Sequence, residues 1–406
     1  MVEWKEYRIK DLGEVVTGNT PPTSNREYYG TEYKFIKPTD MVEGQRFVST
    51  TEEYYSELAY QKYKKCLLPP KTPCVVTIGS LGKKMCLTDT ECFTNQAVNA
   101  VIPNKENDGE FLYYAFKASV LAYVKQLDSG TTSGRENVSK SSFSKIKVRV
   151  PPLRTQQKIA SILSAYDNLI QNYKKQIEAL QTAASELYKE WFVRFRFPGY
   201  KNSRFENGIP EGWKIERIGN IGEVIGGGTP STENEEYWDG DIPWLSPVDL
   251  SDNTNVYVSR GGKNITKLGL QKSSAKMMPK DTVLLSSRAP VGYVALAKNP
   301  ICTNQGFKSV VCNTSVIQPI YLYFYFRMNK NYLQSIASGA TFPELSGSMM
   351  KKLKVLLPQM ELQKEFSKKA NIFISKAELL SEQITNLTQQ RDLLLPRLMR
   401  GALEVH

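Results

Sequence analysis

Residues 151–195 read PPLRTQQKIASILSAYDNLIQNYKKQIEALQTAASELYKEWFVRF and decide the fold. After the two prolines the stretch has no Gly and no Pro, the residues that most often interrupt helices. Its apolar residues step by threes and fours, as on one face of a helix. They are Ile159, Ile162, Tyr166, Ile170, Tyr173, Ile177, Leu180, Ala184, Leu187 and Trp191. The spacing predicts an amphipathic helix of coiled-coil type, about 60 Å long at about 1.5 Å per residue.

A second apolar stripe follows Pro358. Its positions are Leu362, Phe366, Phe373, Ala377, Leu380, Ile384, Leu387, Leu394 and Leu398. A shift of 207 residues carries most of the first stripe onto the second. The positions expected to pack the helices together are Tyr166, Ile170, Tyr173, Ile177, Leu180 and Leu187 with Phe373, Leu380, Ile384, Leu387 and Leu394. Arg391 interrupts the second stripe opposite Ala184, and Pro396 is expected to kink or end its last turn.

A helix of this length cannot bury its own apolar face. We expect the two helices to pack together antiparallel, because the globular part between them in sequence can carry the chain back. The alternative is that each helix packs only on its own globular domain. We favour the pair, because the stripe is too long for one small domain to cover.

The regions that precede the two helices repeat each other. Residues 4–40 align with residues 213–249 with 16 identities in 37 positions, where unrelated sequences of average composition would give about two or three. The register persists at Thr94-Asn95-Gln96 and Thr303-Asn304-Gln305. After a slip of two residues it continues into both helices. The chain is therefore a duplication of one unit, a globular domain followed by a long helix.

The globular parts mix strand and helix signals. Strands are predicted at 75–78, 145–150, 282–285 and 353–357, and helices with aromatic faces at 111–127 and 320–336. The predicted fold class is α+β, with two similar globular domains joined by two long antiparallel helices packed as a coiled coil with pseudo-twofold symmetry. The predicted boundaries are 1–150 and 198–358 for the globular domains and 151–197 and 359–406 for the helical regions.

The scarce residues argue against most catalytic sites. The only histidine is His406, so a Ser-His-Asp triad and a His-ligated zinc site are not expected. The six cysteines form no CxxC pair and are predicted to be small buried residues. Phosphate-loop, dinucleotide-binding and amino-methyltransferase motifs are missing. No window is apolar enough for a transmembrane helix, and the N-terminal residues MVEWKEYRIK lack the apolar region of a signal peptide, so we expect a soluble, cytoplasmic protein.

The excess charge points to a polyanion. The chain has 53 Lys and Arg against 41 Asp and Glu, a net charge of +12. Two similar basic modules suggest a nucleic acid that is contacted twice, although a soluble protein can also be basic without such a partner. Four polar loops are the candidate contacts: 77–84, 131–140, 286–293 and 338–348.

Within these loops, Arg and Asn can bind base edges while Lys and Ser can bind phosphates. The candidate DNA-binding residues are Ser80, Lys83, Lys84, Arg135, Asn137 and Lys140 in the first module and Ser287, Arg288, Tyr293 and Thr341 in the second. The loop GSLGKK at 79–84 aligns with RAPVGY at 288–293. The scaffold repeats while the loop chemistry differs, so the two modules are expected to read two different sequences.

Several segments together resemble the specificity subunits of type I restriction-modification systems. They are VPPLRTQQKIA at 150–160 with LSAYDNLI at 163–170, GEVIGGGTP at 222–230 with the following EYW and IPW, and TNQGF at 303–307. The first module departs from this pattern locally, with Phe35 in place of the Trp and Ala97 in place of the Gly.

The resemblance implies a non-catalytic subunit that binds double-stranded DNA. The two globular domains would be target recognition domains, each of which binds one half of a bipartite asymmetric site. The two helical regions would be spacers, and the paired helices would fix the spacing and dock two methyltransferase subunits. Restriction subunits that translocate and cleave can join such complexes. S-adenosylmethionine, ATP and Mg²⁺ would belong to the partner subunits, so the chain itself is expected to hold no cofactor or metal and to have no membrane partner.

Two other functions remain open from the residues alone. A nuclease or methyltransferase with its own recognition domains would need a catalytic centre, for which the triplet Glu3-Trp4-Lys5 is a weak candidate. An RNA-binding or scaffolding protein could share the fold.

Overall fold

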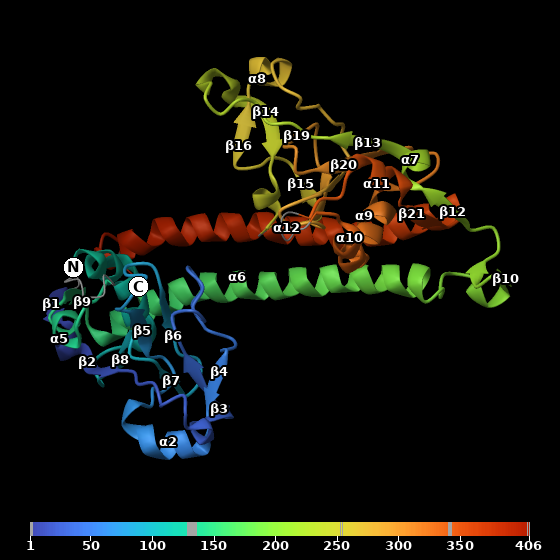
Figure 1. Cartoon of the computed structure of the whole chain (residues 1–406). Coiled ribbons are helices and arrows are strands. Elements are labelled where there is room, and N and C mark those ends of the chain that lie inside the picture. The colour runs from blue at the N-terminus through green and yellow to red at the C-terminus, as the bar shows by residue number, and fades with distance from the viewer. Residues whose placement is uncertain are drawn as a thin grey trace. The chain divides into compact units, whose positions relative to one another are not determined.

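The computed structural model describes residues 3–127, 136–251, 253, 255–339, 343–403 and 405. The chain divides into two compact units (Figure 1). One unit comprises the chain up to Asn172 together with Ile384 onward, and the other comprises Tyr173–Gln383. Each unit contains one globular module and one segment from each of two long helices. We call the residues up to Val150 the first module and residues 198–358 the second module.

The two predicted long helices are confirmed. Helix α6 spans Leu153–Tyr188 and continues into a π-helical turn at Lys189–Val193. Helix α12 spans Met360–Met399 and contains Pro396, so this proline lies in the last turn. Helix α6 follows β9 (Lys147–Val150) and Pro151-Pro152, and α12 follows β21 (Lys354–Leu357), Pro358 and Gln359, so the prolines precede both helices, where the missing N–H of proline costs no helical hydrogen bond.

The first module contains two sheets. Its elements are β1 (Lys5–Arg8), α1 (Ile9–Leu12), β2 (Gly13–Thr17), β3 (Tyr29–Ile36), β4 (Glu53–Tyr55), α2 (Glu57–Tyr63), β5 (Pro73–Val76), β6 (Met85–Leu87), β7 (Cys92–Thr94), β8 (Val98–Pro103), α3 (Gly109–Ala115), α4 (Leu121–Gln126), α5 (Lys140–Ser144) and β9 (Lys147–Val150). The larger sheet has the strand order β2-β8-β5-β6 and the smaller has the order β4-β3-β7. Strands β1 and β9 form a separate antiparallel pair. The helix predicted at 111–127 is interrupted by a π-helical turn at Phe116–Val120.

The second module repeats this plan. Its elements are β10 (Phe205–Glu206), β11 (Ile209–Pro210), β12 (Lys214–Arg217), α7 (Ile218–Ile221), β13 (Gly222–Gly226), β14 (Trp238–Leu245), β15 (Tyr257–Val258), β16 (Lys263–Ile265), α8 (Lys267–Gln271), β17 (Val283–Leu285), β18 (Val294–Ala297), β19 (Cys302–Thr303), β20 (Lys308–Cys312), α9 (Pro319–Met328), α10 (Lys330–Ile336), α11 (Gly347–Lys352) and β21 (Lys354–Leu357). The sheets have the orders β13-β20-β17-β18-β15 and β16-β14-β19. Strands β12 and β21 pair as β1 and β9 do.

A buried glutamine ties each long helix to its module. The side-chain amide of Gln156 donates to the carbonyl of Pro151 at 2.9 Å and its oxygen accepts from the backbone N–H of Asp108 at 2.9 Å. Gln363 makes the same two bonds, to Pro358 at 2.8 Å and from Gln318 at 3.0 Å. Buried amides need such partners because an unpaired polar group costs about 1–3 kcal/mol. The repeated glutamine therefore fixes the start of each long helix.

Both long helices contribute to the core of each unit. In the first unit, Leu163 of α6 and Leu398 of α12 join a core that contains Phe111. In the second unit, Phe366 of α12 is fully buried and its ring centroid lies 6.1 Å from that of Trp191 and 5.6 Å from that of Phe324. The alternative in which each helix packs only on its own domain is therefore wrong.

The second unit also gives the direction of the helix pair. Trp191 meets Phe366, and earlier residues of α6 meet later residues of α12, because Leu180 and Ala377 line one cavity. The two helices run antiparallel there, as expected for neighbours joined through an intervening domain.

The positions predicted to pack the helices differ in burial. Ile170, Ile177 and Leu380 are buried, whereas Tyr166, Tyr173, Leu180, Leu187, Phe373, Ile384, Leu387 and Leu394 are half-buried. Ile374 and Leu395, one residue beyond Phe373 and Leu394, are buried more deeply.

Four of the six cysteines are buried, as predicted, and Cys66 and Cys312 are half-buried. Burial raises the pKa of Cys302 to about 11 and that of Cys312 to about 12, so both thiols stay protonated at neutral pH. Among the described residues no group of three or more His, Cys, Asp or Glu side chains is placed to hold a metal ion. Of the helices described, none is both long and apolar enough to cross a membrane.

We predict that Phe366→Ala lowers the free energy of unfolding by about 3–5 kcal/mol, because it leaves a cavity among buried aromatic rings. The matched control is Ile372→Ala on the same helix, since Ile372 is 66% exposed. Urea unfolding of both variants checks this. Equal losses in the two variants would contradict the assignment of Phe366 to the core.

Candidate nucleic-acid interface

One end of the larger sheet in the first module gathers loops that are far apart in sequence. Strand β2 ends at Thr17 opposite Asn99 of β8, and β5 ends at Val76 opposite Val98, the first residue of β8. Because these strands are antiparallel, the loops after β2 and β5 and the turn before β8 meet at this end. We call it the loop end of the sheet.

Two of the predicted contact loops meet at the loop end of the first module. The backbone N–H of Gly79 donates to the carbonyl of Glu136 at 2.9 Å, and that of Val138 donates to Thr77 at 2.8 Å. Gly79 and Gly82 have φ of +84° and +72°, a conformation that strains other residues. These glycines shape the loop, and residues 136–138 form its second wall.

The candidate DNA-binding residues of the first module differ in their exposure to solvent. Ser80, Lys83 and Lys140 are exposed, and Lys140 is the first residue of α5. Lys84 is half-buried because its ammonium donates to the carbonyl of Pro38 at 2.8 Å. Asn137 is half-buried and its backbone bridges to Ile78. Arg135 lies outside the described residues.

The second module has the same loop end. The backbone N–H of Ser287 donates to the carbonyl of Gly306 at 2.7 Å, and the N–H of Leu345 donates to the carbonyl of Ser287 at 2.9 Å. The loops 286–293 and 338–348 therefore meet as their counterparts do. Thr341 of the second loop lies outside the described residues.

Ser287, predicted from the sequence as a DNA contact, lies in the interior of the module. Its side chain is fully buried, and its hydroxyl donates to the carbonyl of Gly306 at 3.1 Å. The hydroxyl thus joins two loops of the scaffold and does not reach the surface to contact DNA.

Arg288 and Tyr293 are both half-buried and each is held by a neighbour. A guanidinium nitrogen of Arg288 lies 3.9 Å from Glu344, and the ammonium of Lys308 lies 3.2 Å from the same carboxylate. The ammonium of Lys330 lies 5.1 Å from the ring centre of Tyr293. One carboxylate thus lies near two cations at the loop end, so these three side chains together keep a net positive charge.

A repeated threonine–glutamine pair at the loop end was missed by sequence reasoning. The hydroxyl of Thr20 donates to the side-chain oxygen of Gln96, and Thr229 bonds in the same way to Gln305. Both glutamines are exposed. Gln96 and Gln305 therefore join the candidate interface, since an oriented glutamine amide can bind base edges. The repeated Thr-Asn-Gln triplet was the available signal, but the sequence did not show that it lies beside the threonine loop.

The close packing of the Thr-Asn-Gln segment against the loop before the threonine explains why glycine occurs at two repeated positions. A Cβ at Gly18 would overlap the carbonyl oxygens of Thr94 and Asn95, and one at Gly227 would overlap those of Thr303 and Asn304. Both modules need glycine here because two backbone segments approach closely.

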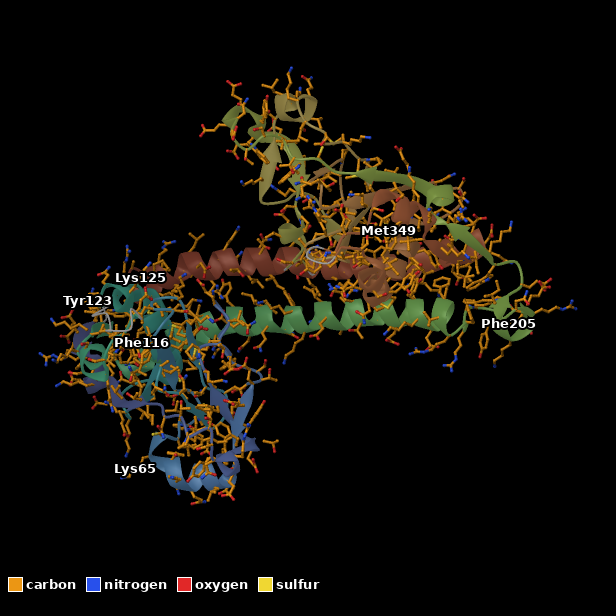
Figure 2. All side chains as sticks on the ribbon, in the orientation of Figure 1. Lys65, Phe116, Tyr123, Lys125, Phe205 and Met349 are labelled. Carbon is orange, nitrogen blue, oxygen red and sulfur yellow. The ribbon has the colours of Figure 1, made fainter. Side chains whose placement is uncertain are left out.

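An aromatic and basic cluster near α2 was also missed. The rings of Tyr33 and Tyr60 stack with centroids 4.7 Å apart, and the ammonium of Lys64 lies 5.7 Å from the centre of the Tyr60 ring. Lys62 donates to the hydroxyl of Tyr28 at 2.5 Å, a bond that raises the pKa of Lys62. Lys65 is exposed beside them (Figure 2). Interleaved lysines and tyrosines are typical of surfaces that bind nucleic acids.

Comparison with known proteins identifies one family. The family model described as "Type I restriction modification DNA specificity domain" matches residues 1–182 and 210–389, both halves of the duplication. The MjaIX specificity subunit of Methanocaldococcus jannaschii is 44% identical over 179 residues, which are 44% of this chain and 41% of that relative. The chain thus spans less than half of that relative's length in this match.

Two further matches extend over nearly the whole chain. The HindI specificity subunit of Haemophilus influenzae is 23% identical, with 99% of this chain and 100% of that relative covered. A crystal structure of an S subunit from M. genitalium superposes with a TM-score of 0.65 at 18% identity, with 98% of this chain and 96% of that chain covered. This structural likeness supports the fold.

We predict that Ser287→Ala lowers the free energy of unfolding by about 1 kcal/mol, because it leaves the Gly306 carbonyl without this partner. Ser80→Ala in the corresponding loop of the first module should be neutral, since Ser80 is exposed. Thermal unfolding of both variants tests the difference. A neutral Ser287→Ala would contradict a stabilising role for the hydrogen bond between this hydroxyl and Gly306.

Proposed function

The chain belongs to the family of type I restriction-modification specificity subunits, and from this premise we propose that each module binds one half of a bipartite, asymmetric site in double-stranded DNA. The observation that carries the proposal is the duplication itself. Two modules repeat one scaffold, including the Thr20–Gln96 and Thr229–Gln305 pairs, yet present different side chains at the loop end.

The differences fit distinct half-sites. The first module presents Lys83 and Lys140, which suit phosphate contacts, and the second presents Arg288, which can bind guanine through two hydrogen bonds. Different side chains on equal scaffolds would read different bases, so the combined site would not be palindromic. Half-sites read from one face of B-DNA would be centred about 34 Å apart.

The long helices serve in this proposal as a spacer and as a docking surface. They would hold the two modules at a fixed separation and bind two methyltransferase subunits, with restriction subunits joining the complex. Ile372 and Leu379, which are 66% and 47% exposed, lie seven residues apart and so share one face of α12. Exposed apolar side chains on a helix are suited to a protein partner.

The chain itself would be non-catalytic. Adenine methylation, with S-adenosylmethionine, would take place in the methyltransferase subunits, and ATP and Mg²⁺ would be used by restriction subunits. The chain's part would be to position the duplex so that a partner can extrude an adenine from the stack. Lys5 and Glu3, the two charged residues of the weak nuclease triplet, form an exposed ion pair at 3.6 Å.

Variants at the two loop ends test whether each module binds its own half-site. The full chain with its methyltransferase partner is used to select duplexes from a random library. Arg288→Ala should weaken the base preference in one half-site only. The free energy that separates the preferred base from the others should fall by about 1–3 kcal/mol at the affected position. Lys83→Ala should leave the selected sequence unchanged and reduce the slope of log affinity against log salt by about one. Relaxation of both half-sites by Arg288→Ala would contradict the proposal.

Docking is tested separately from DNA binding. Ile372→Ser combined with Leu379→Ser should weaken the methyltransferase complex at least about tenfold, because each apolar side chain loses buried contact area. Lys364→Ser, at an exposed position of the same helix, should have no effect. Titration calorimetry with the partner subunit measures both. Unchanged affinity of the double variant would place the docking surface elsewhere.

A further inference from the structure

A buried ion pair joins α6 to α12 in the first unit. A guanidinium nitrogen of Arg391 lies 2.5 Å from one carboxylate oxygen of Asp167, and both side chains are only 10% exposed. The hydroxyl of Tyr114, in the first module, donates to the other oxygen of Asp167 at 2.6 Å. The triad of Tyr114, Asp167 and Arg391 thus connects the module and both helices.

The second unit has an apolar triad in the same place. The shift of 207 residues carries Asp167 to Ile374 and relates Arg391 to Ala184. The bonds from Asp108 to Gln156 and from Gln318 to Gln363 align α3 with α9, so that Tyr114 corresponds to Phe324. Phe324, Ile374 and Ala184 are all at most 3% exposed and line one small cavity. The duplicated scaffold therefore accepts either a polar or an apolar triad.

Stability alone does not account for the polar triad. Replacing a buried ion pair by well-packed apolar residues is often neutral or stabilising, because the desolvation of two charges offsets their attraction. Removing one partner, in contrast, is strongly destabilising because a buried charge stays unpaired. A buried pair therefore discriminates between correct and incorrect partners more than it strengthens the correct one.

The duplication creates incorrect partners that need such discrimination. Because α6 and α12 are repeats with similar apolar stripes, α6 could pair with α6 of a second copy, and α12 with α12. In the first pairing Asp167 would lie opposite Ala184 of the second copy. In the other, Arg391 would lie opposite Ile374 of the second copy. In the first pairing Asp167 would lose its cation and keep only the hydroxyl of Tyr114. In the other, Arg391 would keep only Asp392, its neighbour on α12, whose side chain is 53% exposed. Pairing α6 with α12 instead brings the two buried charges together.

We propose that Tyr114, Asp167 and Arg391 form a recognition element that makes α6 select α12 over a second copy of α6. The partner excluded by this element is another molecule of the same chain. The element keeps one first module and one second module in each helix pair, and so preserves the asymmetry of the protein. It acts in the absence of DNA and of any other subunit.

Two differently tagged copies of the full chain, expressed together, test the proposal. The variant Tyr114→Phe/Asp167→Ile/Arg391→Ala gives the first unit the side chains of the second. Its unfolding temperature should equal or exceed that of the natural chain. The fraction of complexes that carry both tags should rise at least about tenfold, since the unpaired charges that oppose self-pairing are gone. An unchanged mixed fraction would overturn the proposal.

A single substitution provides the second readout. Arg391→Ala leaves Asp167 opposite alanine whichever helix it meets, so the preference for α12 is lost. The variant should unfold at a lower temperature than the natural chain and should also form more mixed complexes. Arg397→Ala, at an exposed position of the same helix, is the control and should change neither quantity. A loss of stability in Arg391→Ala without added mixing would mean that the pair only stabilises the fold, and would overturn the proposal.

Discussion

The apolar face of each long helix is the constraint on which the structure depends. Neither α6 nor α12 can be covered by one module, because each stripe continues well beyond the residues that a single module buries. The chain meets this constraint by giving each unit a segment of both helices, so that Phe366 of α12 packs against Trp191 beyond the end of α6. A module without the other half of the duplication would leave such surfaces in water, at a cost of about 25 cal/mol per Å².

The repeated scaffold separates what must stay fixed from what can vary. Gln156 and Gln363 fix the helix starts, and Gly18 and Gly227 allow the close approach of two backbone segments. None of these residues depends on the chemistry of the loops beside them. The loop ends can therefore carry Lys83 in one module and Arg288 in the other without a change of fold. This separation is what a protein that reads two different half-sites requires.

Long-range periodicity made the helices and the duplication predictable from the sequence. An apolar stripe that recurs over ten positions fits a helix better than any other element, and 16 identities at one offset indicate a duplication. The loop ends were predictable only as a set of segments. Ser287 was misjudged because its partner, the Gly306 carbonyl, lies 19 residues away in sequence. The π-helical turn at Phe116–Val120 gives no signal in the apolar pattern that continues through it.

The ion pair between Asp167 and Arg391 was also not predictable from the sequence. Arg391 stood out in the sequence as a break in an apolar stripe, but Asp167 lies 224 residues earlier and did not stand out. Their pairing follows from the antiparallel register of the helices, which only the structure supplies. The charge that sequence reasoning treated as an interruption has a partner, and its counterpart Ala184 shows that a small apolar residue also fits at this position.

Mapping N6-methyladenine across a genome in cells that express this chain with its methyltransferase partner would show whether the two modules bind two different half-sites. We expect one motif with two short, different half-sites separated by a fixed number of unspecified bases, and one methylated adenine in each half. A continuous palindromic motif, or methylation without a motif, would contradict it.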